Sequence, residues 1–489
     1  MKKKDSILSD SRYKIAKIIL LLAFVATTAL LFVLRGQYKQ MSFLGGDEPH
    51  YIMMADSLIK DGDFNLKNDY ELSRALTYYP VPALFPHVAA IIDYTNTDKW
   101  YSIHTVGLPI LIALPYKLFG LLGARLLLIV IQLASALLFF KLLEKYLKDR
   151  YRVIIGMILL YCCTFFWQNL GGIFPDLVIV SIAGAAILLF GKKGVIYNSL
   201  FTALLCIGVL VHSKVALLIG PIYIAHLLYL LKDMGWSIWI KKYGLYSIVI
   251  LLFAIIYSTY IYGAYGVYLP SQLYGTKGQL FAGNIIVNGT AVLLDKTKGL
   301  VIYYPVILVA GPYLYLAARR VIDGVVLYVK QLQIPKSAYL FIGLSVGLVA
   351  LLITQLGFDD WSGSFSPNGR YMLVFIFALI FVVAKYINYK NLLEIFVVGS
   401  ATLASALISI VIARKLDIYL DTGLESVVTT KFEILKAFPL YPLVIKTVTN
   451  AQLYRSISII VLVVLFNILL YKFYTNQRLK EAFTIKNID

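Results

Sequence analysis

Charge is scarce in this chain of 489 residues: Asp, Glu, Lys and Arg make up only 15% of it, against 60% hydrophobic residues. Soluble globular domains carry about a quarter charged residues. Long uncharged runs occur instead, and roughly 17–25 consecutive apolar residues suffice to cross a bilayer as a helix. The shortage of charge argues against a soluble globule and predicts one polytopic membrane unit rather than several soluble domains.

Cysteine is also rare, with three residues in the whole chain. Cys162, Cys163 and Cys206 all lie inside apolar runs, so they form no disulfide framework and no metal-binding spacing. No P-loop, dinucleotide-binding fingerprint or nucleic-acid-binding motif occurs. The N-terminal run 18–34 is followed by no small-residue cleavage site, which predicts an uncleaved first span.

Acidic residues are scarcer than basic ones. The chain has 26 Asp and Glu against 45 Lys and Arg, which gives a formal net charge of +19. The basic residues lie mostly in short loops, where they orient membrane proteins with these loops in the cytoplasm. This predicts an all-α polytopic protein of about twelve transmembrane helices, within a range of 11–13, with both termini inside. The predicted spans are 16–34, 122–143, 152–168, 172–190, 196–212, 214–231, 243–263, 300–317, 337–356, 371–387, 392–413 and 455–474.

One apolar segment, 105–120, is short for a span and contains two prolines. Counting it as a span would place the later basic loops outside, so we assign it as re-entrant or interfacial. It then belongs to a large outer loop over 35–121 that carries short interfacial helices.

Six polar stretches fall on the outer face in this topology. They are GGDEPHY (45–51), YSIH (101–104), GGIFPD (171–176), HSK (212–214), LLDKTKGL (293–300) and DDWSGSFSPNGRY (359–371). A random scatter would divide such stretches between the two sides. Their shared side predicts a polar site that opens away from the cytoplasm.

Asp47 and Glu48 in the first stretch have two interpretations. The Gly-Gly pair and Pro49 favour a turn and helix start, in which a carboxylate caps the helix. Alternatively, Asp47 is ionised at neutral pH and accepts a proton from an acceptor hydroxyl as a general base.

Cations accompany these carboxylates on the outer face. Lys214 lies between two apolar runs, either at the membrane interface, where it snorkels, or within the bundle. Arg370 directly precedes the apolar run 371–387 on its predicted outer side, where the positive-inside rule does not explain an arginine. A guanidinium at this place can bind a phosphate through two hydrogen bonds. Lys298 belongs to a third cationic cluster, in DKTKG. Carboxylates beside cations fit group transfer from a lipid-linked phosphate.

Several further residues are candidates for substrate contact or support: His50, Tyr51, His104, Asp176, His212 and Asp295. The histidines are also interpretable as ordinary hydrogen-bonded side chains. A divalent metal stays open, with Glu48 and His50 as weak candidate ligands, although their spacing matches no metal motif.

Taken together, four stretches resemble the GT-C superfamily of membrane glycosyltransferases. The branch is that of dolichyl-phosphate-mannose protein mannosyltransferases and lipid A aminoarabinose transferases, in a bacterial subgroup without an assigned substrate. GDEPHYIMMADSLIKDGDFNLKNDY (46–70) is the most specific stretch. YSIHTVGLPILIALPYKLFG (101–120), LLDKTKGLVIYYPVILVAGP (293–312) and WSGSFSPNGRYML (361–373) follow in the same order within 16–390.

The resemblance implies a hexosyl or pentosyl transferase that uses a polyprenyl-monophosphate sugar and inverts the anomeric carbon. Asp47 would be the base, Glu48 its acidic neighbour, and Lys214, Arg370 and Lys298 the phosphate ligands. The acceptor would be a glycan, lipid or protein at the extracytoplasmic face of the inner or plasma membrane. Protein O-mannosylation is disfavoured, because the extra soluble repeats of those enzymes are missing.

The module that resembles the family covers 1–390. Residues 391–489 add C-terminal helices and an outer segment, 414–454, that is a candidate for acceptor recognition. The main alternative function is a transporter or flippase of a lipid-linked glycan, which would also use outward cations. Such proteins often contain internal repeats with matching broken helices, and no second copy of GGDEPHY occurs.

Overall fold

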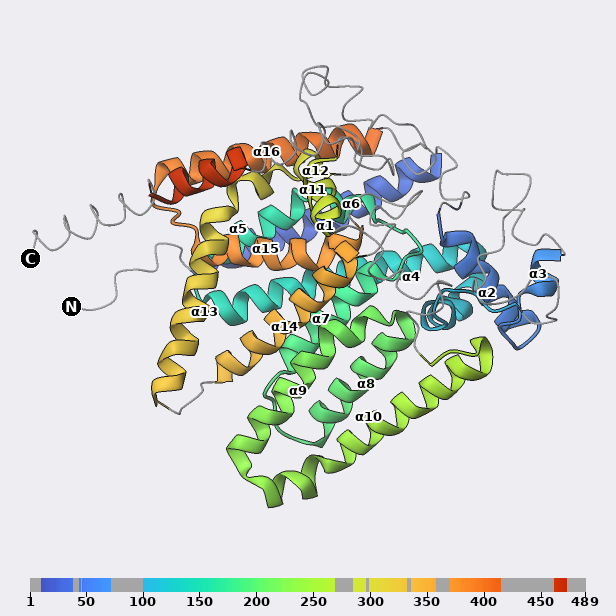
Figure 1. The fold of residues 1–489 in the computed structure, drawn as a ribbon. Coiled ribbons are helices and arrows are strands. Elements are labelled where there is room, and N and C mark those ends of the chain that lie inside the picture. Colours follow the sequence, from blue (N-terminus) through green and yellow to red (C-terminus); the bar gives the residue numbers. More distant parts are fainter. Residues whose placement is uncertain are drawn as a thin grey trace, which may run out of the picture.

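The computed structural model describes residues 10–37, 44, 46–71, 100–268, 285–295, 299–331, 336–357, 370–414 and 461–472. Within these ranges the secondary structure is helical and contains no strand. The helices pack side by side into one bundle, with α2 and α3 together at one end (Figure 1). The elements are α1 (Asp10–Gln37), α2 (Glu48–Lys60), α3 (Lys67–Glu71), α4 (Gly107–Leu147), α5 (Arg150–Tyr161), α6 (Thr164–Gln168), α7 (Asp176–Leu189), α8 (Val195–Val211), α9 (Lys214–Met234), α10 (Trp236–Tyr265), α11 (Ile285–Leu294), α12 (Leu300–Tyr303), η5 (Pro305–Val309), α13 (Gly311–Gln331), α14 (Lys336–Gly357), η6 (Arg370–Met372), α15 (Leu373–Tyr386) and α16 (Leu392–Arg414).

Six of these helices are long and apolar enough to cross a membrane, namely α1, α4, α9, α10, α14 and α16. Further apolar helices are shorter, including α7, α8, α11 and residues Val461–Lys472. The expectation of an all-α membrane protein is therefore confirmed in its coarse form. The predicted count of about twelve spans is not confirmed by these helix lengths.

Two predicted spans are interrupted. The run 152–168 is divided into α5 and α6 at Cys162 and Cys163, and the indole N–H of Trp167 donates to the carbonyl of Tyr161 across the break, at 2.6 Å. The run 300–317 is divided among α12, η5 and α13 at Tyr304 and Pro305. Proline lacks the N–H that a helix interior needs, so it begins a new element here.

The segment predicted as re-entrant or interfacial is the first part of α4. Gly120 breaks this helix with a φ of 60°, a left-handed value that side chains disfavour. A Cβ on Gly123 would lie 2.1 Å from the carbonyl oxygen of Pro115, so the two parts of α4 meet at a sharp bend. Within the predicted outer loop, α2 and α3 are the short helices that the structure describes.

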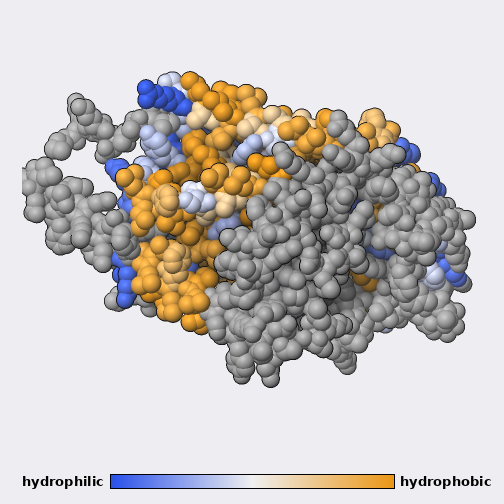
Figure 2. Space-filling model, turned by 90° about the horizontal axis from the view of Figure 1, so that it is seen from above, coloured by the Kyte–Doolittle hydropathy of each residue, from blue (hydrophilic) through white to orange (hydrophobic). Residues whose placement is uncertain are grey.

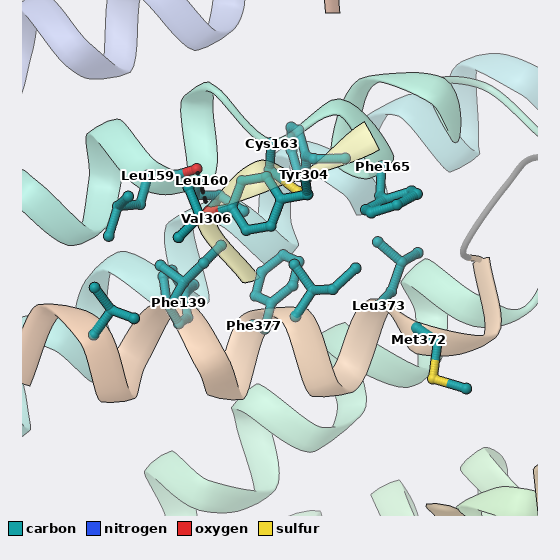
Figure 3. Packing of buried hydrophobic residues seen from close by; sticks show 14 of the residues in the cluster. Phe139, Leu159, Leu160, Cys163, Phe165, Tyr304, Val306, Met372, Leu373 and Phe377 are labelled. Carbon is teal, nitrogen blue, oxygen red and sulfur yellow. Dashed lines mark hydrogen bonds between the residues drawn. The ribbon is translucent and has the colours of Figure 1, made fainter. Parts of the chain in front are cut away.

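The apolar core lies where α4, α5, α7 and α15 meet, and Figure 3 shows its central part. Tyr304 is fully buried there, close to Phe139 and Phe377, and its hydroxyl donates to the carbonyl of Leu159 at 3.1 Å. Burying large aromatic side chains stabilises this region through close packing, because dispersion contacts in a dense core add up.

A second contact positions the functional site. Gly343 and Gly347 on α14 are spaced as in a GxxxG motif and face α9, and a Cβ on Gly347 would lie 2.5 Å from the carbonyl oxygen of Leu218. Small residues at this spacing let two helices approach closely. The close approach holds α9 and α14 antiparallel, with Lys214 at the start of α9 beside Gln355 near the end of α14.

Helices α9 and α14 set the distance between the two ends of the bundle. They contain 21 and 22 residues, which at 1.5 Å per residue corresponds to about 30 Å, close to the thickness of a bilayer's hydrocarbon core. Figure 2 shows apolar residues between hydrophilic residues at the left and right margins of the described surface. Charged groups at opposite ends of α9 and α14 are thus separated by about one membrane thickness.

Candidate functional site

The turn before α2 presents Asp47. Gly46 has a φ of 55°, which turns the chain, and Asp47 occupies the N-cap position of α2 with Pro49 in the first turn. The Asp47 side chain makes no capping hydrogen bond, so the interpretation as a helix cap is not supported. Its side chain is 21% exposed, which leaves the carboxylate reachable by a substrate.

Glu48 fastens this turn to the bundle. Arg125 on α4 donates to both of its carboxylate oxygens, at 3.1 and 3.3 Å, and the backbone N–H of Ile173 donates to it at 2.8 Å. Arg125 also donates to the carbonyl of Gly171 at 2.8 Å. Both charged side chains are buried, so each depends on the other for compensation. This pair joins α2, α4 and the GGIFPD stretch, and so positions Asp47.

Arg370 approaches Asp47 from a stretch more than 300 residues away. Its Nη2 donates to Oδ2 of Asp47 at 2.7 Å and to the hydroxyl of Tyr371 at 2.6 Å. Its guanidinium carbon lies 4.5 Å from the ring centroids of both Phe174 and Tyr371. Burial alone would lower the pKa of Arg370, but Tyr371, Asp47 and Asp176 raise it well above the ordinary value. Arg370 is therefore a fixed positive charge.

Lys214 is the second cation at this place. Its Nζ donates to Oε1 of Gln355 at 2.7 Å and lies 4.6 Å from the ring centroid of Tyr371. Tyr371 thus has Arg370 and Lys214 within cation–π distance of one ring. Because Lys214 bonds within the bundle at the start of α9, the interpretation as a snorkelling residue is not supported.

Asp176 and two histidines complete the group. Asp176 begins α7, and the charges of Arg370, Lys214 and Asp47 act on it. Its Oδ2 is buried and has no hydrogen-bond partner among the described residues. His104 Nε2 lies 3.9 Å from Oδ1 of Asp47. We call these residues and His212 the Asp47 cluster: Asp47, His104, Asp176, His212, Lys214 and Arg370.

His212 lies between α8 and α9. Its Nδ1 accepts the backbone N–H of Lys214 at 3.1 Å. Burial, followed by the nearby charges of Lys214 and Arg370, lowers the pKa of His212 well below its usual value. His212 is therefore neutral at pH 7 and can accept hydrogen bonds without adding charge.

An aromatic group lies beside the cluster. The ring centroid of His104 is 4.8 Å from that of Tyr51 and 5.9 Å from that of His50. His50 and the hydroxyl of Tyr70 share a hydrogen bond of 2.7 Å. The Tyr51 ring is buried and packs against His104, so it helps to hold that histidine beside Asp47.

Two predicted residues, Lys298 and Asp295, are not included in the Asp47 cluster. Lys298 lies outside the described residues, as do Lys296 and the segment 415–460 that contains most of the predicted outer segment 414–454. Asp295 follows α11 and is fully buried. In the described part of the chain no group of three or more His, Cys, Asp or Glu side chains is arranged to hold a metal ion. Glu48 is bonded to Arg125, and His50 Nδ1 to the hydroxyl of Tyr70.

Sequence reasoning missed Arg125, Phe174, Gln355 and Tyr371. Arg125 carried a usable signal, because a lone arginine inside a predicted span is costly unless it is paired. Tyr371 was hidden among 37 tyrosines, most of which fit interfacial belts. Phe174 and Gln355 acquire a role only through the packing of distant helices.

Comparisons with family models, with curated proteins and with solved structures find no match to this chain. The case for a function therefore depends on the chemistry of the Asp47 cluster and on the motifs that carry the resemblance.

Proposed function

We propose that this chain is a membrane glycosyltransferase. It moves a sugar from a polyprenyl-monophosphate donor to a hydroxyl of an acceptor on the extracytoplasmic face. The single observation that carries the proposal is the pairing of a partly exposed carboxylate with a buried guanidinium, Asp47 with Arg370 at 2.7 Å, while Lys214 contacts the same Tyr371 ring as Arg370. A base beside two cations is the arrangement that transfer from a phosphate needs.

In the proposed reaction Arg370 and Lys214 bind the donor phosphate. The acceptor oxygen attacks the anomeric carbon, the bond from that carbon to the phosphate oxygen breaks, and its electron pair leaves with the phosphate. Asp47 takes the proton of the acceptor hydroxyl. The cations stabilise the charge that develops on the leaving phosphate. One direct displacement inverts the anomeric carbon.

The ion pair between Asp47 and Arg370 has a role in this sequence of events. Before the donor binds, each group neutralises the other at a buried position. An incoming phosphate competes with Asp47 for the guanidinium, and the released carboxylate becomes available as a base. Donor binding thereby makes Asp47 available as a base. Until the donor is bound, Asp47 stays paired with Arg370 and does not act as a base.

The orientation of the cluster supports an extracytoplasmic reaction. Asp176, Lys214 and Gln355 mark one end of α7, α9 and α14, and Lys192, Lys193 and Lys336 lie at the opposite end. By the positive-inside rule the lysine-rich end faces the cytoplasm. The Asp47 cluster then faces the outside, where lipid-linked sugars rather than soluble nucleotide sugars are the expected donors.

The experiment that tests the proposal is mass spectrometry of lipids that co-purify with the protein from its native membrane in mild detergent. We expect a polyprenyl-monophosphate sugar with the wild type, at least as much with Asp47→Asn, and little with Arg370→Ala. The amide of Asp47→Asn cannot take a proton, so donor accumulates, whereas Arg370→Ala removes a phosphate ligand. Finding no such lipid with any of the three proteins, after addition of a native lipid extract, would contradict the proposal.

A lipid flippase would also retain the lipid, so a second measurement separates the two functions. Proteoliposomes that contain donor lipid and candidate acceptor yield glycosylated acceptor only if the protein is a transferase. Movement of the lipid between leaflets without formation of product would support the flippase.

A further inference from the structure

A cluster of lysines lies at the end of the bundle opposite to Asp47. Lys145 at the end of α4 donates to the carbonyl of Leu188 at 3.2 Å, and Lys336 at the start of α14 donates to the carbonyl of Gly191 at 3.1 Å. Lys192 and Lys193 follow α7 directly. These carbonyls belong to the end of α7, where helical partners are missing. We call the four lysines the lysine end: Lys145, Lys192, Lys193 and Lys336.

The lysine end carries an excess of positive charge. Lys192 and Lys336 are close enough to Lys145 to repel it, and Lys192 and Lys193 likewise repel Lys336. Lys193 pairs with Asp233. In the part of the chain that the structure describes, Lys145, Lys192 and Lys336 have no carboxylate partner. Three cations gathered without a carboxylate partner among the described residues form a place that suits an anion from outside the chain.

Apolar side chains lie next to these cations. Val195 is 70% exposed and Ile196 is 72% exposed, directly after the Lys192–Lys193 pair. Lys192 lies 4.8 Å from the ring centroid of Tyr197, and Lys336 lies 5.6 Å from that of Tyr229. A ligand that satisfies both features has a negative head group and an apolar tail.

We propose that the lysine end binds the head group of an anionic phospholipid from the adjacent leaflet. The lipid phosphate contacts Lys145, Lys192 and Lys336, and its acyl chains cover Val195 and Ile196. Basic groups between transmembrane helices on the cytoplasmic side are suited to this chemistry. The exposed apolar neighbours favour a lipid over a soluble anion, for which they offer nothing. The proposal does not depend on the reaction at Asp47.

The test is native mass spectrometry of the full chain in a neutral detergent, titrated with phosphatidylglycerol or with phosphatidylcholine. We expect the wild type to bind phosphatidylglycerol at least tenfold more tightly than phosphatidylcholine. The variant Lys192→Gln/Lys336→Gln should lose about thirtyfold of its phosphatidylglycerol affinity, since each lysine near a membrane surface contributes about a factor of five. Gln keeps a hydrogen-bond donor at each position, which limits effects on folding.

A matched control removes two lysines from α10. Lys241→Gln/Lys242→Gln takes the same charge from the protein, and we expect its phosphatidylglycerol affinity to stay within threefold of the wild type, about 0.6 kcal/mol. Equal losses in the two double variants would overturn the proposal, because they would show diffuse attraction rather than a site. Displacement of bound phosphatidylglycerol by inorganic phosphate at millimolar concentration would also overturn it, because a soluble anion would then be the better ligand.

Discussion

The two ends of the bundle use charge in opposite ways. At the Asp47 cluster, the buried Arg370 and the half-buried Lys214 lie among carboxylates and aromatic rings, and Arg370 and Asp47 neutralise each other. At the lysine end, the cations are exposed and bond to backbone carbonyls, and only Lys193 has a carboxylate partner within the described residues. Among the described residues, the same chain thus pairs a cation with a carboxylate inside the Asp47 cluster and leaves three lysines without such a partner at the lysine end.

The change that breaks this contrast most strongly is Asp47→Asn. We expect the rate of glycosyl transfer to fall by about 10²–10⁴, the usual contribution of a general base, while donor affinity is kept. Initial rates with saturating donor measure it. Asp56→Asn, on the same helix but paired with Lys60, serves as the matched control and should keep most of the activity. Comparable loss in both variants would remove Asp47 from the role of base.

The next largest effect is on stability. Arg125→Met leaves Glu48 buried without its cation, and breaking such a pair costs about 3–5 kcal/mol. Thermal unfolding of the detergent-solubilised protein measures the loss. Lys117→Met on the exposed side of α4 should change stability by less than about 0.5 kcal/mol. The double variant Glu48→Gln/Arg125→Met should recover part of the loss, and no recovery would mean that Arg125 acts mainly through Gly171.

A smaller effect is expected at the ring that both cations share. Tyr371→Phe keeps the ring but removes the hydroxyl that accepts from Arg370 at 2.6 Å. Because a hydrogen bond to a charged group contributes about 1.5–3 kcal/mol, donor affinity should weaken by at least tenfold. Tyr371→Ala should weaken it further, since the cation–π contacts to Arg370 and Lys214 are lost too. Identical donor KM values for the wild type and both variants would contradict the proposed arrangement of cations.

The smallest expected effect is that of His212 on the pH dependence of the rate. Because burial and the nearby cations lower the pKa of this histidine, it gains a proton only well below its usual range. Its charge therefore does not change between about pH 6 and 8. His212→Asn, which retains an acceptor for the Lys214 amide, should leave the shape of the pH–rate profile unchanged in this window. A profile that loses a titration step near pH 6.5 in the variant would show that His212 is charged in the working enzyme.

The helical membrane class could be predicted from the sequence because long apolar runs and basic loops are direct consequences of the bilayer. The breaks could not all be predicted. Pro305 indicated a break inside 300–317, and the prediction of one continuous span there did not take it into account. No proline or glycine marks the break at Cys162 and Cys163, which tertiary packing and the Trp167 contact to Tyr161 impose. In the described part of the chain six helices are long enough to span a membrane, so the predicted count of about twelve is not confirmed.

At the candidate site, the sequence indicated which stretches share one side of the membrane, and the structure places Asp47, Lys214 and Arg370 close together. The sequence could not indicate that Glu48 bonds to Arg125 whereas Asp47 bonds to Arg370. Neighbouring residues at the start of a helix point in different directions. Which partner each meets depends on α4 and η6, far away in the chain. The catalytic roles themselves stay predictions.

The contacts on either side of His104 have a consequence for how firmly this side chain is held. Leu66 donates its amide to the carbonyl of Trp100 at 2.8 Å, and the amide of Trp100 returns a bond of 2.8 Å to the side chain of Asn65. Thr105 is then tied to the carbonyl of Val211 at 2.6 Å. Trp100 and Thr105 are thus tied to other parts of the chain on either side of His104. His104 therefore lies beside Asp47 on a short stretch anchored at both ends, which limits how far its ring can move from the carboxylate.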